Sequence, residues 1–132
     1  MFPIFGTTGK VIAFAGRVLG NEKTAKYINS AQTKVYNKSE VVYGVNFAKN
    51  EIRKNKEVIL VEGYTDVITL NEHGIKNVVA SSGTALTPGQ MKILHRYGEK
   101  IVMIYDADSA GQKAMKRGID IALAESMEVQ LL

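Results

Sequence analysis

The second half of the chain alternates between short apolar segments and longer amphipathic ones, and this alternation limits the possible fold more than any other feature. Four apolar runs have the length of strands that are buried on both faces, and they span 58–63, 77–83, 100–108 and 128–132. Segments with helical periodicity lie between them, such as 110–125, which places Gly111 and Ala122 on one face. This pattern predicts an α/β fold: a parallel sheet with helices on both faces.

The predicted helices carry recognisable end signals. Thr87 is the expected N-cap of one helix, with Pro88 in its first turn and Gln90 completing a capping box. Its inner stripe is predicted to be Met91, Leu94 and His95, and Gly98 is expected to end it. Gly74 suits the C-terminal cap of the helix before it. These signals fix the order of strands and helices.

The first part of the chain has a different pattern and a different charge. Segments 1–5 and 10–15 flank the turn GTTG and predict a hairpin, 17–38 is polar and rich in turns, and 45–55 predicts a charged helix. Residues 1–57 hold ten Lys and Arg against four Asp and Glu (+6), and residues 58–132 hold seven against nine (−2), which sum to the net +4. We expect a small basic mixed α+β lobe at 1–56, followed by the α/β domain at 57–132.

Composition excludes several classes of protein. The chain has no cysteine, so it forms no disulfide and no thiolate zinc site, which suits a cytoplasmic protein. No apolar run approaches the roughly 20 residues that span a bilayer, and residues 1–10 lack the basic and apolar regions of a signal peptide. We therefore expect no membrane association. The basic first part favours a polyanion as partner, although a solvated Lys-rich surface has the same composition.

Acidic residues gather where two of the predicted strands end. Glu62 ends the first strand, with Asp66 one turn into the next helix; Asp106 ends the third strand and Asp108 follows it. Functional groups collect at the carboxyl edge of parallel sheets, and clustered carboxylates repel one another unless a cation compensates. Oxygen ligands without cysteine favour Mg²⁺ or Mn²⁺. The alternative is that Asp108 only caps the following helix and Asp106 is an ordinary acid at a strand end.

Other candidate residues are weaker. His73 and His95 are isolated on predicted helices and are expected to pack or to face solvent. No GxxxxGK[ST] motif supports ATP hydrolysis by this chain. Tyr27, Tyr36 and Tyr43 alternate with lysines, a pattern that suits either single-stranded nucleic acid or a β-rich core.

Two of these segments together resemble a known domain. VEGYTD (61–66), followed about forty residues later by YDADSAGQKA (105–114), resembles the acidic signatures of the Toprim domain, which primases, topoisomerases and some nucleases share. The segments before it, namely MFPI (1–4), GRVLGN (16–21), KYINS (26–30) and VYNKSEVVYG (35–44), resemble the lobe that precedes Toprim in bacterial DnaG-type DNA primases. The resemblance covers essentially the whole chain in the right order.

The resemblance implies synthesis of short RNA primers on a single-stranded DNA template from ribonucleoside triphosphates. Glu62, Asp106 and Asp108 match the catalytic and metal-binding acids of the family, and Asp66 matches the second acid of its EGYxD motif. Four further residues match positions of the N-terminal lobe implicated in template or nucleotide binding: Arg17, Lys26, Asn29 and Lys38. Mg²⁺ or Mn²⁺ would be the cofactor.

Two departures from the family matter. Ala107 stands where the family commonly has glycine, and the family's further acidic pair would lie beyond Leu132. The zinc-binding domain and the region that engages the replicative helicase are also not in this chain. We therefore expect a central piece of a longer protein, which alone binds metal weakly, binds no zinc and makes little or no primer. The alternatives are a Toprim domain of a topoisomerase or nuclease and a non-catalytic nucleic-acid-binding module.

Overall fold

The computed structural model describes residues 1–18, 27–82 and 85–132, and its elements alternate as the sequence predicts. The N-terminal part holds three strands and a short 3₁₀ helix: β1 (Phe2–Phe5), β2 (Val11–Arg17), β3 (Tyr27–Asn29) and η1 (Lys38–Glu40). The rest of the chain alternates: α1 (Val45–Asn55), β4 (Glu57–Val61), α2 (Tyr64–Glu72), β5 (Val78–Ala80), α3 (Pro88–His95), β6 (Lys100–Met103), α4 (Ser109–Ala124) and β7 (Glu128–Leu131).

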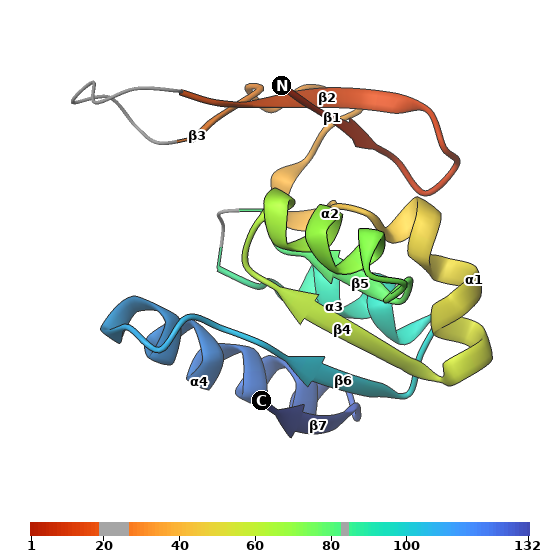
Figure 1. Cartoon of the computed structure of the whole chain (residues 1–132), viewed down its shortest axis with the longest axis vertical. Coiled ribbons are helices and arrows are strands. Elements are labelled where there is room, and N and C mark those ends of the chain that lie inside the picture. Colours follow the sequence, from red (N-terminus) through yellow and green to blue (C-terminus); the bar gives the residue numbers. More distant parts are fainter. Residues whose placement is uncertain (19–26, 83–84) are drawn as a thin grey trace.

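The second half folds into one parallel sheet with the strand order β5-β4-β6-β7 (Figure 1). All three strand pairs are parallel, and Leu60 of β4 lies opposite Met103 of β6. Strands β4 and β6 are therefore neighbours although a helix, a strand and another helix separate them in the sequence. This adjacency brings the ends of the first and third predicted strands together, which the sequence left open.

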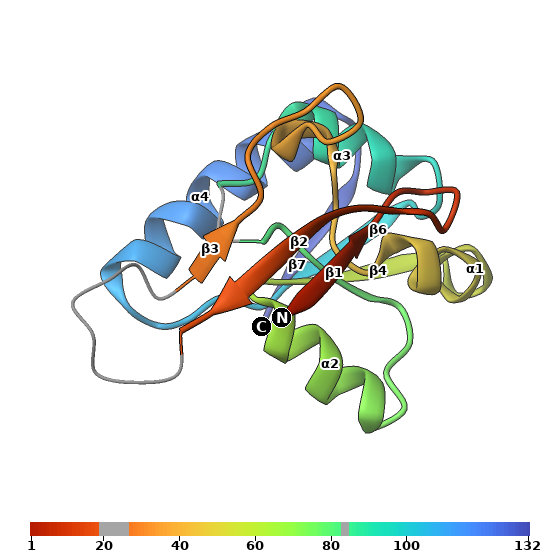
Figure 2. The ribbon, with the colours of Figure 1, turned by 90° about the horizontal axis from the view of Figure 1, so that it is seen from above.

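Helices cover both faces of this sheet, which confirms the predicted fold class (Figure 2). Val58 and Leu60 of β4 face one core, where residues of α1, α3 and α4 cover them. Ile59 and Val61, which alternate with them, face the other core beneath α2. Because both faces are covered, the strand has no polar side, and this is why its sequence is an almost unbroken apolar run.

The end signals of the helices are confirmed in detail, with one correction. The Thr87 hydroxyl accepts a hydrogen bond from the Gln90 backbone amide, and Gln90 Oε1 accepts one from the Thr87 backbone amide, as in a capping box. Gly74 follows α2 with a φ of 89°, which favours glycine. His95, predicted on the inner stripe of α3, is instead exposed, because the stripe is complete with Met91 and Leu94.

The N-terminal strands form an antiparallel sheet of order β1-β2-β3, drawn as a separate layer in Figure 1. Strand β3 lies inside segment 17–38, which was predicted to be polar and rich in turns. The strand was not predicted, because its three residues are too few to produce a pattern. One face of this sheet packs on Tyr36 and Tyr64, both almost fully buried. Tyr27 and Tyr43 are half-buried and pack against the same cluster, so the core alternative is confirmed for Tyr36 and holds in part for the other two.

The helix α1 joins the two sheets. Its buried residues Val45, Ala48 and Ile52 belong to the core of the parallel sheet.

The division of the chain into an N-terminal lobe (1–56) and an α/β domain (57–132) stays a prediction. In the ranges that the structure describes, no helix is both long and apolar enough to cross a bilayer.

Candidate active site

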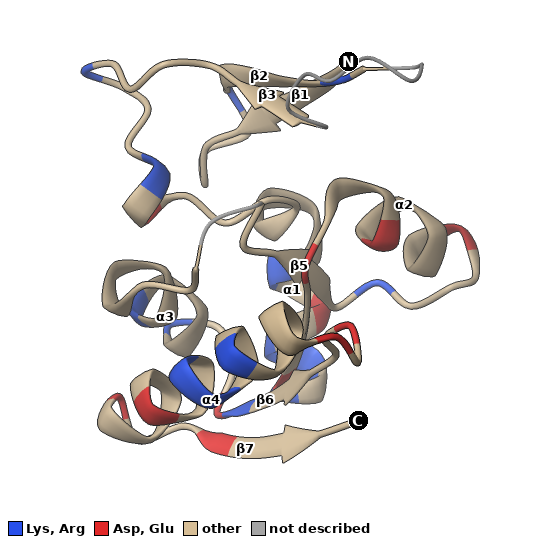
Figure 3. Cartoon of the chain, turned by 90° about the vertical axis from the view of Figure 1, so that its left-hand side faces the viewer, with Lys and Arg blue, Asp and Glu red and all other residues tan. Residues whose placement is uncertain are grey.

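The ends of β4 and β6 bring Glu62 and Asp106 together. The backbone amide of Asp106 donates a hydrogen bond to Glu62 Oε1 at 2.9 Å. Glu62 is half-buried, whereas the Asp106 side chain is exposed. Acidic residues of the two strand ends and of the first turn of α2 lie toward one side of the molecule (Figure 3). The predicted convergence of acids from two separate segments is thus present at the carboxyl edge of the sheet.

A glycine allows α4 to begin directly against this pair. A Cβ atom at Gly111 would overlap the backbone carbonyl of Asp106 and would lie 3.1 Å from Glu62 Oε1. No larger residue fits there without moving the loop that carries Asp106. Glycine is therefore required at position 111, because the Asp106 backbone packs directly against it.

The other two acids have local structural tasks. Asp66 Oδ2 accepts a hydrogen bond from the Gly63 amide at 3.0 Å and stabilises the first turn of α2. Asp108 is the N-cap of α4, because its Oδ1 accepts from the Gly111 amide at 2.7 Å. Each carboxylate keeps a second oxygen that accepts no bond from the described residues. Asp108 therefore caps α4, as the alternative interpretation predicted. Its role as a metal ligand stays a prediction.

Tyr105, next to Asp106 in the chain, packs against the core of the parallel sheet. The Tyr105 hydroxyl is buried and has no hydrogen-bond partner among the described residues. Burial, together with the nearby negative charge of Glu62, raises the pKa of Tyr105 to about 12. The phenol therefore stays neutral beside the Glu62 carboxylate.

The donor set at this edge fits a hard divalent cation. Within residues 1–18, 27–82 and 85–132, no three His, Cys, Asp or Glu side chains are grouped closely enough to hold a metal ion by themselves. Mg²⁺, however, usually takes one or two carboxylates and keeps several waters. The linked pair of Glu62 and Asp106 supplies two such carboxylates, with oxygen as the only donor type.

A cavity of about 360 Å³ opens over the acids and reaches the N-terminal sheet. Its lining includes Glu62, Asp66 and Asp106 from the parallel-sheet part and Arg17 and Tyr27 from the N-terminal sheet. The Arg17 guanidinium lies over the Tyr27 ring, 5.7 Å from the ring centroid. One cation and three carboxylates thus line a single space that is large enough for a nucleotide phosphate group.

The predicted residues of the N-terminal lobe have different positions. Arg17 lines the cavity. Asn29 lies behind it, where its Oδ1 accepts from the Tyr64 hydroxyl at 2.9 Å and its amide group approaches the Ser82 carbonyl at 3.4 Å. Lys38 lines a separate small hollow with Ser82. Lys26 lies outside the described residues.

Sequence reasoning assigned no role to Tyr64 and Thr65, which line the cavity together with Ser82. Tyr64 is 2% exposed and stacks on Phe2 of β1 with a centroid distance of 5.1 Å. One indication in the sequence that Tyr64 belongs to the site was its position between Glu62 and Asp66. Both histidines are exposed and lie outside this cavity, in agreement with their predicted minor role.

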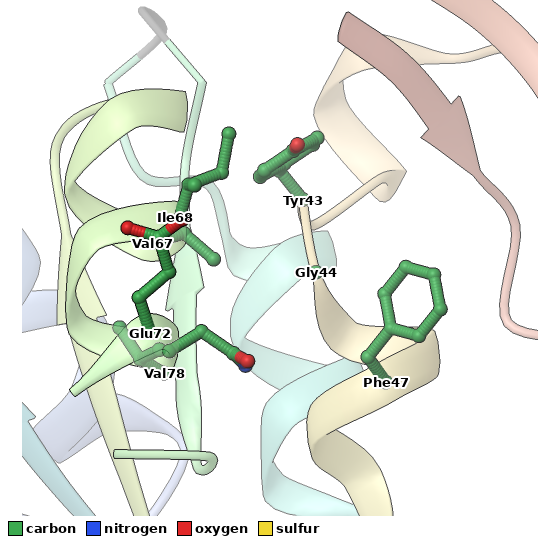
Figure 4. A pocket seen from close by; sticks show the side chains of 8 residues that line it. Tyr43, Gly44, Phe47, Val67, Ile68, Glu72 and Val78 are labelled. Atoms are coloured by element: carbon green, nitrogen blue, oxygen red, sulfur yellow. The ribbon is translucent and has the colours of Figure 1, made fainter. Parts of the chain in front are cut away.

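A second hollow, of about 340 Å³, has a different character (Figure 4). It lies between α1 and α2, and Tyr43, Phe47 and Ile68 give it apolar walls. Glu72 is the only ionisable carboxylate among the described residues that line it. It therefore offers no set of groups for metal or phosphate chemistry.

Family comparisons agree with the geometry. The family described as "Toprim-like" matches residues 59–132, more than half of the chain. The family described as "DNA primase catalytic core, N-terminal domain" matches residues 1–49. The second match favours a primase over a topoisomerase or nuclease, because it covers the part of the chain that precedes Toprim.

Similar proteins point the same way. The DNA primase of Clostridium acetobutylicum is 50% identical over 133 residues, which cover 100% of this chain and 22% of that protein. The DNA primase of Helicobacter pylori is 48% identical over 114 residues, covering 86% of this chain and 20% of that protein. The chain thus spans about a fifth of the length of these relatives.

Solved structures match the whole arrangement. The zinc-binding and RNA polymerase domains of Aquifex aeolicus primase match with a TM-score of 0.93 and 43% identity, covering 98% of this chain and 32% of that chain. A DnaG primase catalytic domain bound to single-stranded DNA matches with a TM-score of 0.88 and 36% identity, covering 100% and 42%. The chain belongs to the Toprim-like family and, within it, to the bacterial DnaG-type DNA primases.

Proposed function

We propose that this chain is the central part of a primase catalytic core, a nucleotidyltransferase that makes short RNA primers on a single-stranded DNA template from ribonucleoside triphosphates. One observation carries the proposal: Glu62 and Asp106, at the ends of adjacent parallel strands, line a cavity that Arg17 of the N-terminal sheet also lines. Phosphoryl chemistry needs such a pairing, because a cation site and a basic side chain together hold a polyphosphate.

In this mechanism the residues of the chain bind and orient the reactants. Glu62 and Asp106 would hold Mg²⁺ or Mn²⁺, with Asp108 contributing the oxygen that its helix cap leaves free. When bound, the divalent ion neutralises the triphosphate and stabilises the charge that develops during nucleotidyl transfer. Asp66 keeps the start of α2 in place through the Gly63 amide and adds a further carboxylate to the cavity.

The basic lobe has the complementary task. Arg17 would bind a phosphate of the nucleotide or template, because guanidinium groups bind phosphate oxygens in a bidentate manner. Asn29 supports this side of the cavity through Tyr64. We assign template or nucleotide contacts also to Lys26 and Lys38. A similar DnaG catalytic domain is bound to single-stranded DNA, which supports this choice of template.

The proposal extends to the wider setting of the protein. Residues 1–56 act as a template-binding lobe and residues 57–132 as the Toprim domain. The replicative helicase would be engaged through regions outside this chain, and the site of action would be the cytoplasm.

The test is primer synthesis by a full-length bacterial DNA primase in which this chain replaces the matching segment. Asp106→Asn keeps the size of the side chain and removes its charge, so synthesis of labelled RNA on single-stranded DNA should fall at least ~100-fold, more than the loss of an outer-shell partner causes. Asp120→Asn, an exposed acid on α4, is the matched control and should retain activity. Equal activity of both variants, or cleavage of plasmid DNA in place of synthesis, would contradict the proposal.

A further inference from the structure

A third cavity, distinct from the acidic one, lies at the other end of the N-terminal sheet. It has a volume of about 490 Å³ and is enclosed by the turn between β1 and β2, the segment around η1, and α3. Its lining contains three cations: Lys34, Lys92 and Arg96. Lys92 lies on α3 and Arg96, four residues later, is its C-cap residue in helical conformation, so both side chains reach the same cavity.

The positive charge of this cavity is only partly compensated, because three cations and one carboxylate line it. None of the three cations forms an ion pair or hydrogen bond among residues 1–18, 27–82 and 85–132. Glu40 is the only carboxylate among the described residues that line the cavity. Three like charges that converge on one hollow repel one another, and an anionic ligand removes this repulsion.

The cavity is also preformed. Gln90 of α3 is fully buried, and its Nε2 donates to the carbonyls of Lys38 at 3.1 Å and Val41 at 2.8 Å. A Cβ atom at Gly89 would lie 2.8 Å from the Ser39 carbonyl, so glycine is needed where α3 meets η1. Because these contacts fix α3 against the η1 segment, a ligand would bind without first ordering the cavity walls.

The lining of the cavity also suits a nucleic acid. The lining includes the apolar side chains of Val35, Val41 and Ile93, which suit bases or sugars between phosphates. Val41 also lines the small hollow that contains Lys38, and that hollow shares Ser82 with the acidic cavity. This small hollow has a volume of only about 10 Å³, too little for a nucleotide, so a strand that reaches both larger cavities would pass over the surface around Lys38.

We propose that the Lys34–Lys92–Arg96 cavity binds the phosphate backbone of the single-stranded nucleic acid on its way to or from the acidic cavity. This proposal rests on the primase function proposed above and adds a binding surface outside the catalytic edge. Its chemistry is electrostatic and independent of sequence, because lysine and arginine contact phosphates and no base edge needs to be read.

The experiment measures binding of a fluorescent oligothymidylate to the full chain by anisotropy over a series of salt concentrations. Lys92→Ala/Arg96→Ala should weaken binding about tenfold at low salt and flatten the salt dependence by about 1.4, since each lost phosphate contact on a single strand contributes about 0.7. Lys113→Ala/Arg117→Ala is the control, because it removes two exposed cations with the same spacing from α4. Lys34→Ala tests the cavity from another segment and should flatten the salt dependence by about 0.7.

Each contrary result has a defined meaning. An equal loss in the α4 control, or no change in salt dependence in the α3 variant, overturns the proposal. Equal competition by ATP at the same nucleotide concentration would overturn it in favour of a mononucleotide site. Loss of polyglutamate binding with unchanged oligothymidylate binding would overturn it in favour of an acidic protein partner.

Mn²⁺ titration of the same proteins separates this proposal from the primase function. Lys92→Ala/Arg96→Ala should retain Mn²⁺ affinity while its salt dependence changes. Asp106→Asn should lose Mn²⁺ affinity while the salt dependence stays. If Asp106→Asn changes neither Mn²⁺ binding nor primer synthesis, the proposed function fails and the result for the cavity still stands.

Discussion

Two of the polar joints between the N-terminal part of the chain and the parallel-sheet part differ in how firmly they hold. At the acidic cavity, the Tyr64 hydroxyl donates one hydrogen bond to Asn29 at 2.9 Å. At the basic cavity, Gln90 is fully buried and donates to two backbone carbonyls on the η1 segment. The first joint is held mainly by aromatic packing, whereas the second is held by hydrogen bonds that nothing else can replace.

The two joints hold the walls of their cavities in different ways. Tyr64 contacts Phe2, Tyr27 and Tyr43, and stacking contacts of this kind tolerate small displacements. A buried amide that satisfies two carbonyls tolerates very little, because each unpaired carbonyl costs its full desolvation penalty. We expect the basic cavity to be the stiffer of the two and the acidic cavity to adjust to its ligands.

The largest effect is expected at the stiff joint. Gln90→Ala leaves the carbonyls of Lys38 and Val41 unpaired and removes the capping box of α3, so the free energy of unfolding should fall by about 3 kcal/mol. Urea denaturation followed by circular dichroism measures the change. Gln112→Ala, an exposed glutamine on α4, should stay within about 0.5 kcal/mol of the original protein. Similar losses in both variants would show that the buried hydrogen bonds of Gln90 contribute no more to stability than an exposed glutamine does.

A smaller effect is expected where backbone packing positions the acids. Gly111→Ala places a methyl group against the Asp106 carbonyl, so we expect a loss of about 2 kcal/mol even though alanine is the better helix former. Mn²⁺ affinity should fall with it, because the loop carrying Asp106 must move away from Glu62. Lys116→Ala, at an exposed site on the same helix, is the reference. Unchanged Mn²⁺ affinity in Gly111→Ala would mean that the acidic edge does not depend on this contact.

The smallest effects distinguish two tyrosines near the acidic cavity. Tyr64→Phe removes the hydrogen bond to Asn29 and should cost about 1 kcal/mol of unfolding free energy. Tyr105→Phe removes a buried hydroxyl without a partner among the described residues, so it should cost nothing or stabilise the protein slightly. Thermal denaturation of both variants side by side makes the comparison. The expectation is wrong if Tyr105→Phe destabilises the protein as much as Tyr64→Phe does.

Much of this architecture was predictable, because it depends on patterns formed by residues that are close together in the sequence. The caps at Thr87 and Gly74 and the apolar run before Glu62 depend on neighbouring residues only. Strand β3 was missed, because three residues give too short a pattern and the antiparallel pairing with β2 stabilises them. His95 was assigned to the wrong side, since helical spacing alone does not show how wide the covered stripe is.

The sequence by itself identified the candidate cation ligands, because four carboxylates at two strand ends repel one another unless a cation neutralises them. It also determined the fold class through the alternation of strands and helices. Only the tertiary structure decided that β4 and β6 are adjacent, that Arg17 lines the same cavity as the acids and that Lys34 meets α3. These facts depend on contacts between segments far apart in the chain, and no local pattern encodes which of several possible neighbours a strand or loop will choose.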